Sequence, residues 1–206
     1  MSYQETIDYL FGLQKHGIKF GLSNSIQLMG LMGDPQRRFQ SVHIAGTNGK
    51  GSTAAFLAGM LRAAGYRVGL YTSPHLVSFT ERIRINGIPV TEERVVGLAE
   101  RVRARYENVR SAEGGPLTPT FFEVTTAMAF TCFAEERVDI AVVEAGMGGR
   151  LDSTNVIDPC VGSPNTTTGA DTSNGASAAR TSDATEATSD SSNPIGRTPI
   201  PNGSYT

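Results

Sequence analysis

The sequence has little of what would place it in several large classes of protein. Its 206 residues include two cysteines, Cys132 and Cys160, whose separation fits neither a disulfide framework nor a metal-binding motif. No apolar run approaches the roughly 20 residues that cross a membrane, and the N-terminus lacks the basic start and apolar core of a signal peptide. A net charge of -2 provides no basic surface for nucleic acid or anionic lipid. We therefore expect a cytoplasmic protein with no nucleic-acid partner and no membrane partner.

Large apolar residues are scarce after Pro159. From residue 161 to residue 206 the chain consists mainly of Ser, Thr, Ala, Gly, Asn and Pro, and its only large apolar residues are Val161, Ile195, Ile200 and Tyr205. Such a composition buries too little surface to offset the conformational entropy that is lost on ordering. We therefore predict a folded domain over residues 1–160 and a low-complexity, disordered tail over residues 161–206.

Hydrophobic periodicity before residue 160 predicts alternating helices and strands. Helical spacing occurs over 3–14, 25–31, 50–64, 91–106 and 121–135, buried strands are predicted over 42–45, 66–71 and 138–143, and a hairpin over 83–90. This alternation predicts an α/β fold in which helices cover both faces of a parallel sheet. Ligands of such sheets lie at the carboxyl ends of the strands, so we expect the loops over 46–52, 72–75 and 144–155 to converge.

A glycine-rich loop follows the first predicted strand and leads into a helix that is predicted to begin at Lys50. Such a unit binds phosphate because its glycines turn backbone N–H groups toward an anion, the helix dipole adds partial positive charge, and the lysine adds a full charge. The loop departs from the usual G-x-x-x-x-G-K-[ST] pattern, since Ile44 occupies the first glycine position and Gly51 separates the lysine from the hydroxyl. We predict a nucleotide site formed by Thr47, Asn48, Gly49, Lys50, Gly51 and Ser52; a glycine-rich turn without a ligand is the alternative.

Two polar residues end the neighbouring predicted strands. Glu144 follows the buried strand over 138–143, which is the position from which P-loop proteins offer a carboxylate to Mg²⁺. Ser73, at the end of the strand over 66–71, is a candidate second ligand. A carboxylate that caps a helix or is solvated is the alternative for Glu144. His75 is interpreted as holding the turn after Pro74, with a contact to phosphate or substrate as the alternative, and His16 and His43 are interpreted as structural residues.

Two further segments combine polar groups with turn formers. Thr120-Phe121-Phe122-Glu123 has the T-x-x-E form of a capping box, so Glu123 has a structural and a substrate-binding interpretation. The segment over 146–155 combines glycines with Arg150 and Asp152, which suits a binding loop, although Asp152 could equally be a turn former.

Several of these segments together resemble a known family. Residues 45–52 are similar to the P-loop of the Mur-ligase superfamily, and the glycine after the lysine is the form found in folylpolyglutamate and dihydrofolate synthases. Residues 72–76, 79–87 and 144–155 resemble further signatures of that family, in the same order and at similar spacing. The resemblance covers residues 1–159 and implies a Mur-ligase central domain, which is a P-loop NTPase-like parallel sheet flanked by helices.

The resemblance implies an ATP-dependent amide ligase. ATP would phosphorylate the carboxylate of dihydropteroate or folate, and the amine of L-glutamate would attack the resulting acyl phosphate. By the same resemblance Lys50 and Glu144 would be catalytic, residues 48–52 would bind ATP, and Ser73 and Glu144 would bind Mg²⁺. The pterin pocket would be lined by Gly21, Leu22, Thr120, Phe121, Phe122, Glu123, Leu151, Asp152 and Ser153.

The chain departs from the family after residue 159. The family continues with a metal-binding histidine, a modified lysine and a C-terminal domain, whereas His75 and Lys50 are the last histidine and lysine of this chain. If the codons for residues 171–175 are read in a shifted frame, they permit the sequence His-(Ile/Val)-Glu-Trp. The same shift in the codons for residues 190–194 permits Phe-Ile-Lys-Pro, and both sequences are similar to family segments.

We therefore expect an incomplete domain with a frameshift-derived tail. Such a chain would be inactive alone and prone to aggregate, whereas the complete protein would be monomeric, because a parallel sheet that stops early leaves an apolar edge and face uncovered. A Mur-type ligase for another carboxylate is one alternative function. A nucleotide-binding remnant without catalysis is the other.

Overall fold

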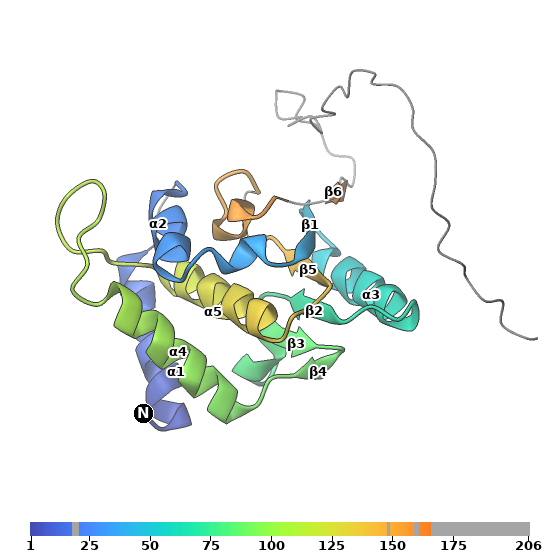
Figure 1. Ribbon diagram of the computed structural model, residues 1–206, viewed down its shortest axis with the longest axis horizontal. Helices are drawn as coiled ribbons and strands as arrows, with labels where there is room; N and C mark the ends of the chain where they lie inside the picture. Colours follow the sequence, from blue (N-terminus) through green and yellow to red (C-terminus); the bar gives the residue numbers. More distant parts are fainter. Residues whose placement is uncertain (18–20, 148, 159–160, 166–206) are drawn as a thin grey trace, which may run out of the picture. The chain divides into compact units, whose positions relative to one another are not determined.

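A six-stranded sheet forms the centre of the computed structural model, which describes residues 1–17, 21–147, 149–158 and 161–165. The strand order is β4-β3-β2-β5-β1-β6 (Figure 1). The strands are β1 (Gln40–Gly46), β2 (Val68–Tyr71), β3 (Ile83–Ile85), β4 (Ile88–Pro89), β5 (Ile140–Glu144) and β6 (Val161–Asn165). Neighbours among β2, β5, β1 and β6 are parallel, while β3 and β4 form an antiparallel hairpin at one edge. The carboxyl ends of the parallel strands therefore meet at one side of the sheet.

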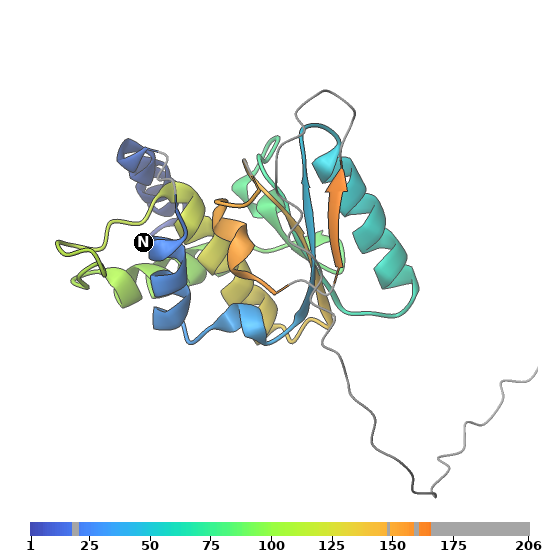
Figure 2. The same cartoon turned by 90° about the horizontal axis from the view of Figure 1, so that it is seen from above.

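Helices cover both faces of this sheet, as predicted. The α-helices are α1 (Tyr3–Gly12), α2 (Ser23–Leu31), α3 (Lys50–Ala63), α4 (Glu92–Tyr106) and α5 (Phe121–Glu135), and the short 3-10 helices are η1 (Leu13–His16), η2 (Pro35–Arg37), η3 (Phe79–Arg82) and η4 (Ser153–Val156). Figure 2 shows α3 on one face of the sheet and α1, α2, α4 and α5 on the other. The predicted α/β class is thus confirmed. In the described part of the chain, none of these helices has the length and apolar character of a membrane span.

Helix α5 is the most buried of the described α-helices. Every residue from Glu123 to Phe133 is buried, because the helix has the sheet on one side and α4, α1 and α2 on the other. Gly69 of β2 allows α5 to approach the sheet closely, since a Cβ atom at this position would lie 2.7 Å from the ring of Phe133. Tyr71 reaches α5 with its hydroxyl, 3.0 Å from Thr125 Oγ1. The apolar run over 121–135 therefore supplies the core of the larger helical layer.

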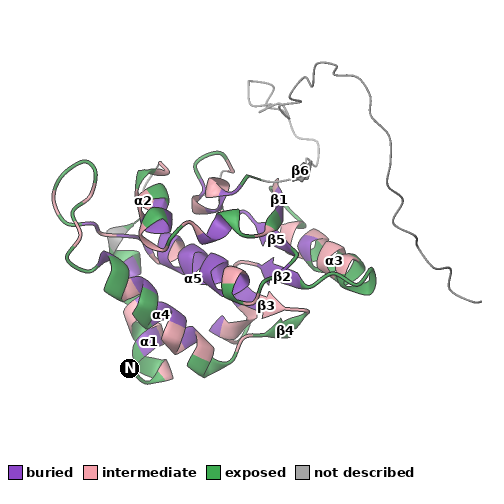
Figure 3. Ribbon diagram, in the orientation of Figure 1, coloured by how far each residue is buried: buried purple, intermediate pink, exposed green. Residues whose placement is uncertain are grey.

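Helix α3 is packed on one side only. Ala54 is its one fully buried residue, and Leu57, Ala58 and Leu61 are partly buried against the sheet. The side chains of Phe56 and Met60 are 74% and 62% exposed. Figure 3 shows the resulting contrast between the buried α5 and the largely exposed α3. The outer side of α3 is thus apolar and open.

Several predicted boundaries differ from those of the structure. The strands predicted over 42–45 and 138–143 are Gln40–Gly46 and Ile140–Glu144, and the helix predicted over 3–14 ends at Gly12. The strand predicted over 66–71 begins at Val68, and the helix predicted over 25–31 begins at Ser23. Strand β6 lies within the segment that composition predicted to be disordered, where residues 161–165 pair in parallel with β1. These residues join the sheet as its edge strand through backbone pairing with β1. Composition predicts how much side-chain surface a segment can bury, and it does not predict backbone pairing of this kind. The rest of the predicted tail, residues 166–206, lies outside the described residues, as does Cys160.

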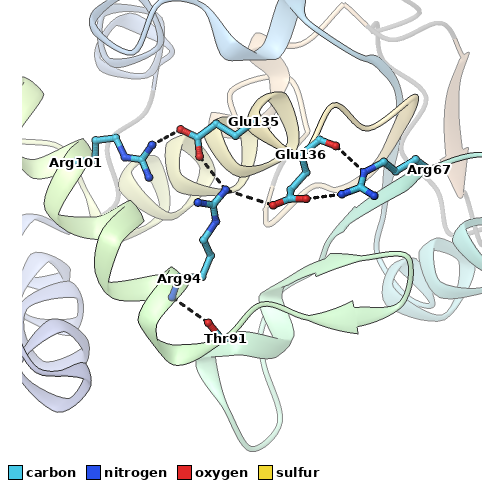
Figure 4. A network of polar contacts seen from close by, with 6 residues as sticks. All are labelled: Arg67, Thr91, Arg94, Arg101, Glu135 and Glu136. Carbon is cyan, nitrogen blue, oxygen red and sulfur yellow. Dashed lines mark hydrogen bonds and ion pairs between the residues drawn. The ribbon is translucent and has the colours of Figure 1, made fainter.

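A chain of ion pairs connects the C-terminus of α5 to two other elements (Figure 4). Glu135 pairs with Arg101 and with Arg94 of α4, the latter at 2.9 Å. Glu136 pairs with Arg94 at 3.5 Å and with Arg67, which precedes β2. The arginines also complement the negative end of the α5 dipole. Each of these side chains is about a third exposed or more, so solvent weakens every single ion pair. The stabilising effect therefore comes from several pairs together.

We predict that Glu135→Gln lowers the free energy of unfolding by about 0.5–1 kcal/mol, because two arginines lose their shared carboxylate. The loss should shrink at high salt, where exposed charges are screened. Urea unfolding of the whole chain at low and high ionic strength measures both effects. Glu107→Gln is the matched control, since it removes one exposed pair with Arg103 on α4. Equal losses for the two variants would contradict a network centred on Glu135.

Candidate functional site

The glycine-rich loop joins β1 to α3 at the carboxyl side of the sheet. Gly49 occupies the N-cap position of α3 with φ +74°, a left-handed conformation that favours glycine. None of the described side chains caps this helix, so its first-turn N–H groups are open to a ligand. A helix start of this kind, with Lys50 as its first residue, attracts phosphate through backbone donors, the helix dipole and the ammonium charge. The strand, loop and helix thus occur in the predicted order.

Glu144 lies beside the glycine-rich loop because β5 pairs with β1. It ends β5 opposite Ile44 and is 5% exposed. A Cβ atom added to Gly51 would lie 3.5 Å from Glu144 Oε2, so the start of α3 and the carboxylate are neighbours. The N–H group of Ser73 donates to the same oxygen at 3.1 Å. The structure therefore brings together Lys50, Gly51, Ser73 and Glu144, from three different strand ends.

Burial raises the pKa of Glu144 above its ordinary value. The hydrogen bond from Ser73 and the charge of Lys50 oppose that rise. Among the described residues no group of three or more His, Cys, Asp or Glu side chains is placed so that it could hold a metal ion. A cation at this place would therefore be held by Glu144 and by the hydroxyl of Ser73, and water or phosphate oxygens would complete its coordination.

A cavity of about 430 Å³ opens next to this cluster. Ser73 lines it, as do most residues that the resemblance assigned to the substrate: Thr120, Phe121, Phe122, Leu151, Asp152 and Ser153. The start of α5 and the loop after β5 supply these residues. Close packing shapes the wall, since a Cβ atom at Gly146 would lie 2.6 Å from the ring of Phe122. The lining therefore combines aromatic and aliphatic side chains with polar ones, Ser73 among them.

Gly21, Leu22 and Glu123 lie elsewhere. They line a second cavity of about 540 Å³, together with polar residues of the loop over 111–118. The carboxylate of Glu123 accepts from the N–H of Thr120 at 2.6 Å, and the N–H of Glu123 donates to Thr120 Oγ1 at 3.2 Å. This is the reciprocal capping box of α5, so the capping interpretation describes the geometry of Glu123. The predicted substrate residues are therefore divided between two cavities.

Asp152 organises the loop that it belongs to. Its carboxylate accepts from the N–H of Met147 at 2.7 Å, from the N–H of Thr154 at 3.0 Å and from the hydroxyl of Thr154 at 2.5 Å. Because Thr154 gives its proton to Asp152, its oxygen accepts from Nε2 of His43 on β1, at 2.8 Å. Burial lowers the pKa of His43, which favours the neutral imidazole, while the charge of Asp152 opposes this shift.

His43, Thr154 and Asp152 thus connect β1, the strand that ends in the glycine-rich loop, to the wall of the first cavity. The interpretation of His43 as structural agrees with this contact. Thr154 was not singled out from the sequence, and only its position two residues after Asp152 in a turn-forming segment could have indicated its role.

Arg82 is a second residue that sequence reasoning left without a role. It lines the first cavity, and its Nε donates to Nδ1 of His75 at 2.8 Å. The ring of His75 also lies near those of Phe11 and Phe79, which agrees with its interpretation as a residue that holds the turn. Arg82 belongs to one of the segments that carry the family resemblance, and that was its only signal in the sequence.

We predict that Asp152→Asn loosens the loop over 146–155, because an amide cannot accept from all three donors. Amide hydrogen exchange in peptides that cover this loop should become about tenfold faster, which corresponds to the loss of one net hydrogen bond. Mass spectrometry of the exchanged chain measures the rate. Ser153→Ala in the same loop is the control. Unchanged exchange in Asp152→Asn would show that the carboxylate does not hold the loop.

Comparison with known proteins places these features in context. No protein-family model matches the chain. The dihydrofolate synthase/folylpolyglutamate synthase of Bacillus subtilis is 45% identical over 159 residues, which is 77% of this chain and 36% of that protein. The chain thus spans little more than a third of the length of this curated relative.

Solved structures of folylpolyglutamate synthases are also similar to this chain. The folylpolyglutamate synthase of Thermotoga maritima is 46% identical with a TM-score of 0.69, and the match covers 76% of this chain and 36% of that one. A complex of folylpolyglutamate synthase with AMPPCP and folate is 38% identical with a TM-score of 0.71, and here the match covers 80% of this chain and 40% of that one. On this likeness in sequence and in structure, the chain belongs to the family of folylpolyglutamate and dihydrofolate synthases.

Proposed function

We propose that the chain binds ATP at residues 47–52 and a pteroate- or folate-type carboxylate in the first cavity. These are the substrates of a ligase that adds L-glutamate to that carboxylate. The proposal rests above all on Ser73, which contacts Glu144 beside the glycine-rich loop and also lines the cavity. A phosphate donor and a carboxylate acceptor would therefore meet at one residue. The folate and AMPPCP in the related complex support this pairing of ligands.

The residues of the site suit phosphoryl transfer to a carboxylate. Lys50 and the first-turn N–H groups of α3 would hold the phosphates and stabilise the charge on the transferred group. The γ-phosphoryl group passes from ATP to a carboxylate oxygen, which forms an acyl phosphate and releases ADP. The amine of L-glutamate then attacks the acyl carbon, and inorganic phosphate leaves as the amide bond forms. The cavity contributes by holding the carboxylate in place for the first of these steps.

The donor set beside the loop fits Mg²⁺. Glu144 offers a carboxylate and Ser73 a hydroxyl, and Mg²⁺ is commonly held by one or two carboxylates while its other positions take water and substrate phosphates. When bound, the ion neutralises charge on the phosphates. The raised pKa of Glu144 follows from burial, and a cation at this place would favour the ionised carboxylate again.

We place the domain that carries these functions at residues 1–160 together with β6, because β6 pairs with the strand that leads into the glycine-rich loop. The chain spans 36% of its Bacillus subtilis relative, so it could bind the ligands without catalysing the complete reaction. A nucleotide-binding module without ligase activity is accordingly tested alongside the ligase.

We expect Lys50→Ala to weaken binding of a fluorescent ATP analogue in the presence of Mg²⁺ by about tenfold or more, because a charge-assisted contact to phosphate is lost. A fluorescence titration of the whole chain measures the affinity. Lys15→Ala is the matched control, since it removes the same charge from η1. Equal affinity in Lys50→Ala and the unaltered chain would refute the nucleotide site. Binding without formation of ADP or glutamylated product would identify a nucleotide-binding module.

Glu144→Gln tests the cation site. The amide oxygen can still accept from Ser73, so the fold should persist while the charge is lost. We expect Mg²⁺ to increase the affinity of the unaltered chain for the ATP analogue and to have at most a small effect on this variant. Glu92→Gln on α4 is the control for charge alone. A full Mg²⁺ effect in Glu144→Gln would remove Glu144 from the proposed site.

A further inference from the structure

Arg82 is a buried arginine that is held from several sides. It ends η3, and only 6% of the residue is exposed. Its Nε donates to His75, and its guanidinium carbon lies 5.2 Å from the ring centre of Phe121 and 5.7 Å from that of Phe79. Such contacts with aromatic faces favour a cation and fix the plane of the guanidinium group. The side chain therefore keeps one position within the wall of the first cavity.

The charge of Arg82 has no anionic counterpart among the residues that the structure describes, where no carboxylate forms an ion pair with it. The adjacent Glu81 uses its carboxylate to accept the N–H groups of Leu76, Val77 and Ser78. His75 offers only a ring lone pair, and its pKa is lowered by burial and then by the charge of Arg82. A buried charge without a counterion is costly, which indicates that a ligand supplies the anion.

The surroundings of Arg82 define the chemistry of that ligand. The cavity that it lines is walled by Phe121, Phe122 and Leu151, which suit a flat aromatic body. Ser73, the residue shared with the proposed nucleotide site, lines the same cavity. An aromatic carboxylate would satisfy both parts, with its ring on the apolar wall and its anion on the guanidinium group. A planar fork of donors matches the two oxygens of a carboxylate.

We propose that Arg82 is the binding residue for the ring-linked carboxylate of a pteroate-type substrate. The inference rests on the proposed function for the identity of the substrate. Arg82 would hold the carboxylate at the end of the cavity that contains Ser73, and so orient the group that is to be phosphorylated. His75, Phe79 and Phe121 position the guanidinium group for this contact.

Pteroate and its primary amide provide the test, because they differ only in the charge of the group that Arg82 is proposed to bind. Isothermal titration of the whole chain should show that pteroate binds about tenfold or more tightly than the amide. Arg82→Met should abolish this preference by weakening pteroate alone. Arg84→Met is the matched control, because Arg84 lies two residues away and its Nε donates to the carbonyl of Glu81. That variant should keep the full preference.

The outcomes separate the carboxylate site from the proposed function. Equal affinity of the unaltered chain for pteroate and its amide, or equal weakening of both ligands by Arg82→Met, would overturn the role of Arg82 while leaving a pterin site in place. If the unaltered chain binds neither, the proposed function fails. The pair 4-aminobenzoate and 4-aminobenzamide then tests Arg82 alone: a preference for the acid that Arg82→Met removes supports the carboxylate site, and no preference overturns it.

Circular dichroism of each variant establishes whether it is folded. Should Arg82→Met not fold, Arg82→Lys takes its place, because it keeps the charge but lacks the planar fork. Weaker binding of pteroate with unchanged binding of the amide would support the proposal. A parallel change for both ligands would assign Arg82 a purely structural role and overturn it.

Discussion

The burial of α5 between the sheet and the other helices is the constraint on which the rest of the structure depends. The helix can lie close to the sheet because Gly69 has no side chain where the ring of Phe133 packs. The N-terminus of the helix is fixed by the capping box of Thr120 and Glu123. With the N-terminus fixed in this way, the first residues of α5 line the first cavity. The core and the wall of the first cavity are therefore both formed by one helix, and a shift of α5 would alter both.

The parallel sheet explains why the polar groups gather where they do. Strands that run in one direction deliver their following loops to one side, so the glycine-rich loop, Ser73 and Glu144 meet although they are far apart in the sequence. Ser73 then belongs both to this cluster and to the cavity. The connection from His43 through Thr154 to Asp152 joins β1 to the cavity wall a second time. The glycine-rich loop and the first cavity are thus connected through the same residues.

Glu144 and Arg82 are two of the buried ionisable groups of this region. Glu144 and Arg82 are 5% and 6% exposed, and neither has a full countercharge at contact distance within the described residues. Both therefore raise the free energy of the unliganded protein, which is a common property of binding sites. A cation at Glu144 and a carboxylate at Arg82 would relieve this electrostatic strain.

The sequence by itself determined the local elements and their order. Apolar periodicity located α3, α4, α5, β1 and β5, and glycine and lysine spacing located the loop before α3, because burial and backbone conformation leave their marks on neighbouring residues. The tertiary structure alone decided which distant side chains meet. It separated Gly21, Leu22 and Glu123 from the first cavity, placed Arg82 against His75 and Phe121, and added β6 to the sheet. Such contacts depend on how helices pack on the sheet and on backbone hydrogen bonds between strands, and neither is encoded in the pattern of a single segment.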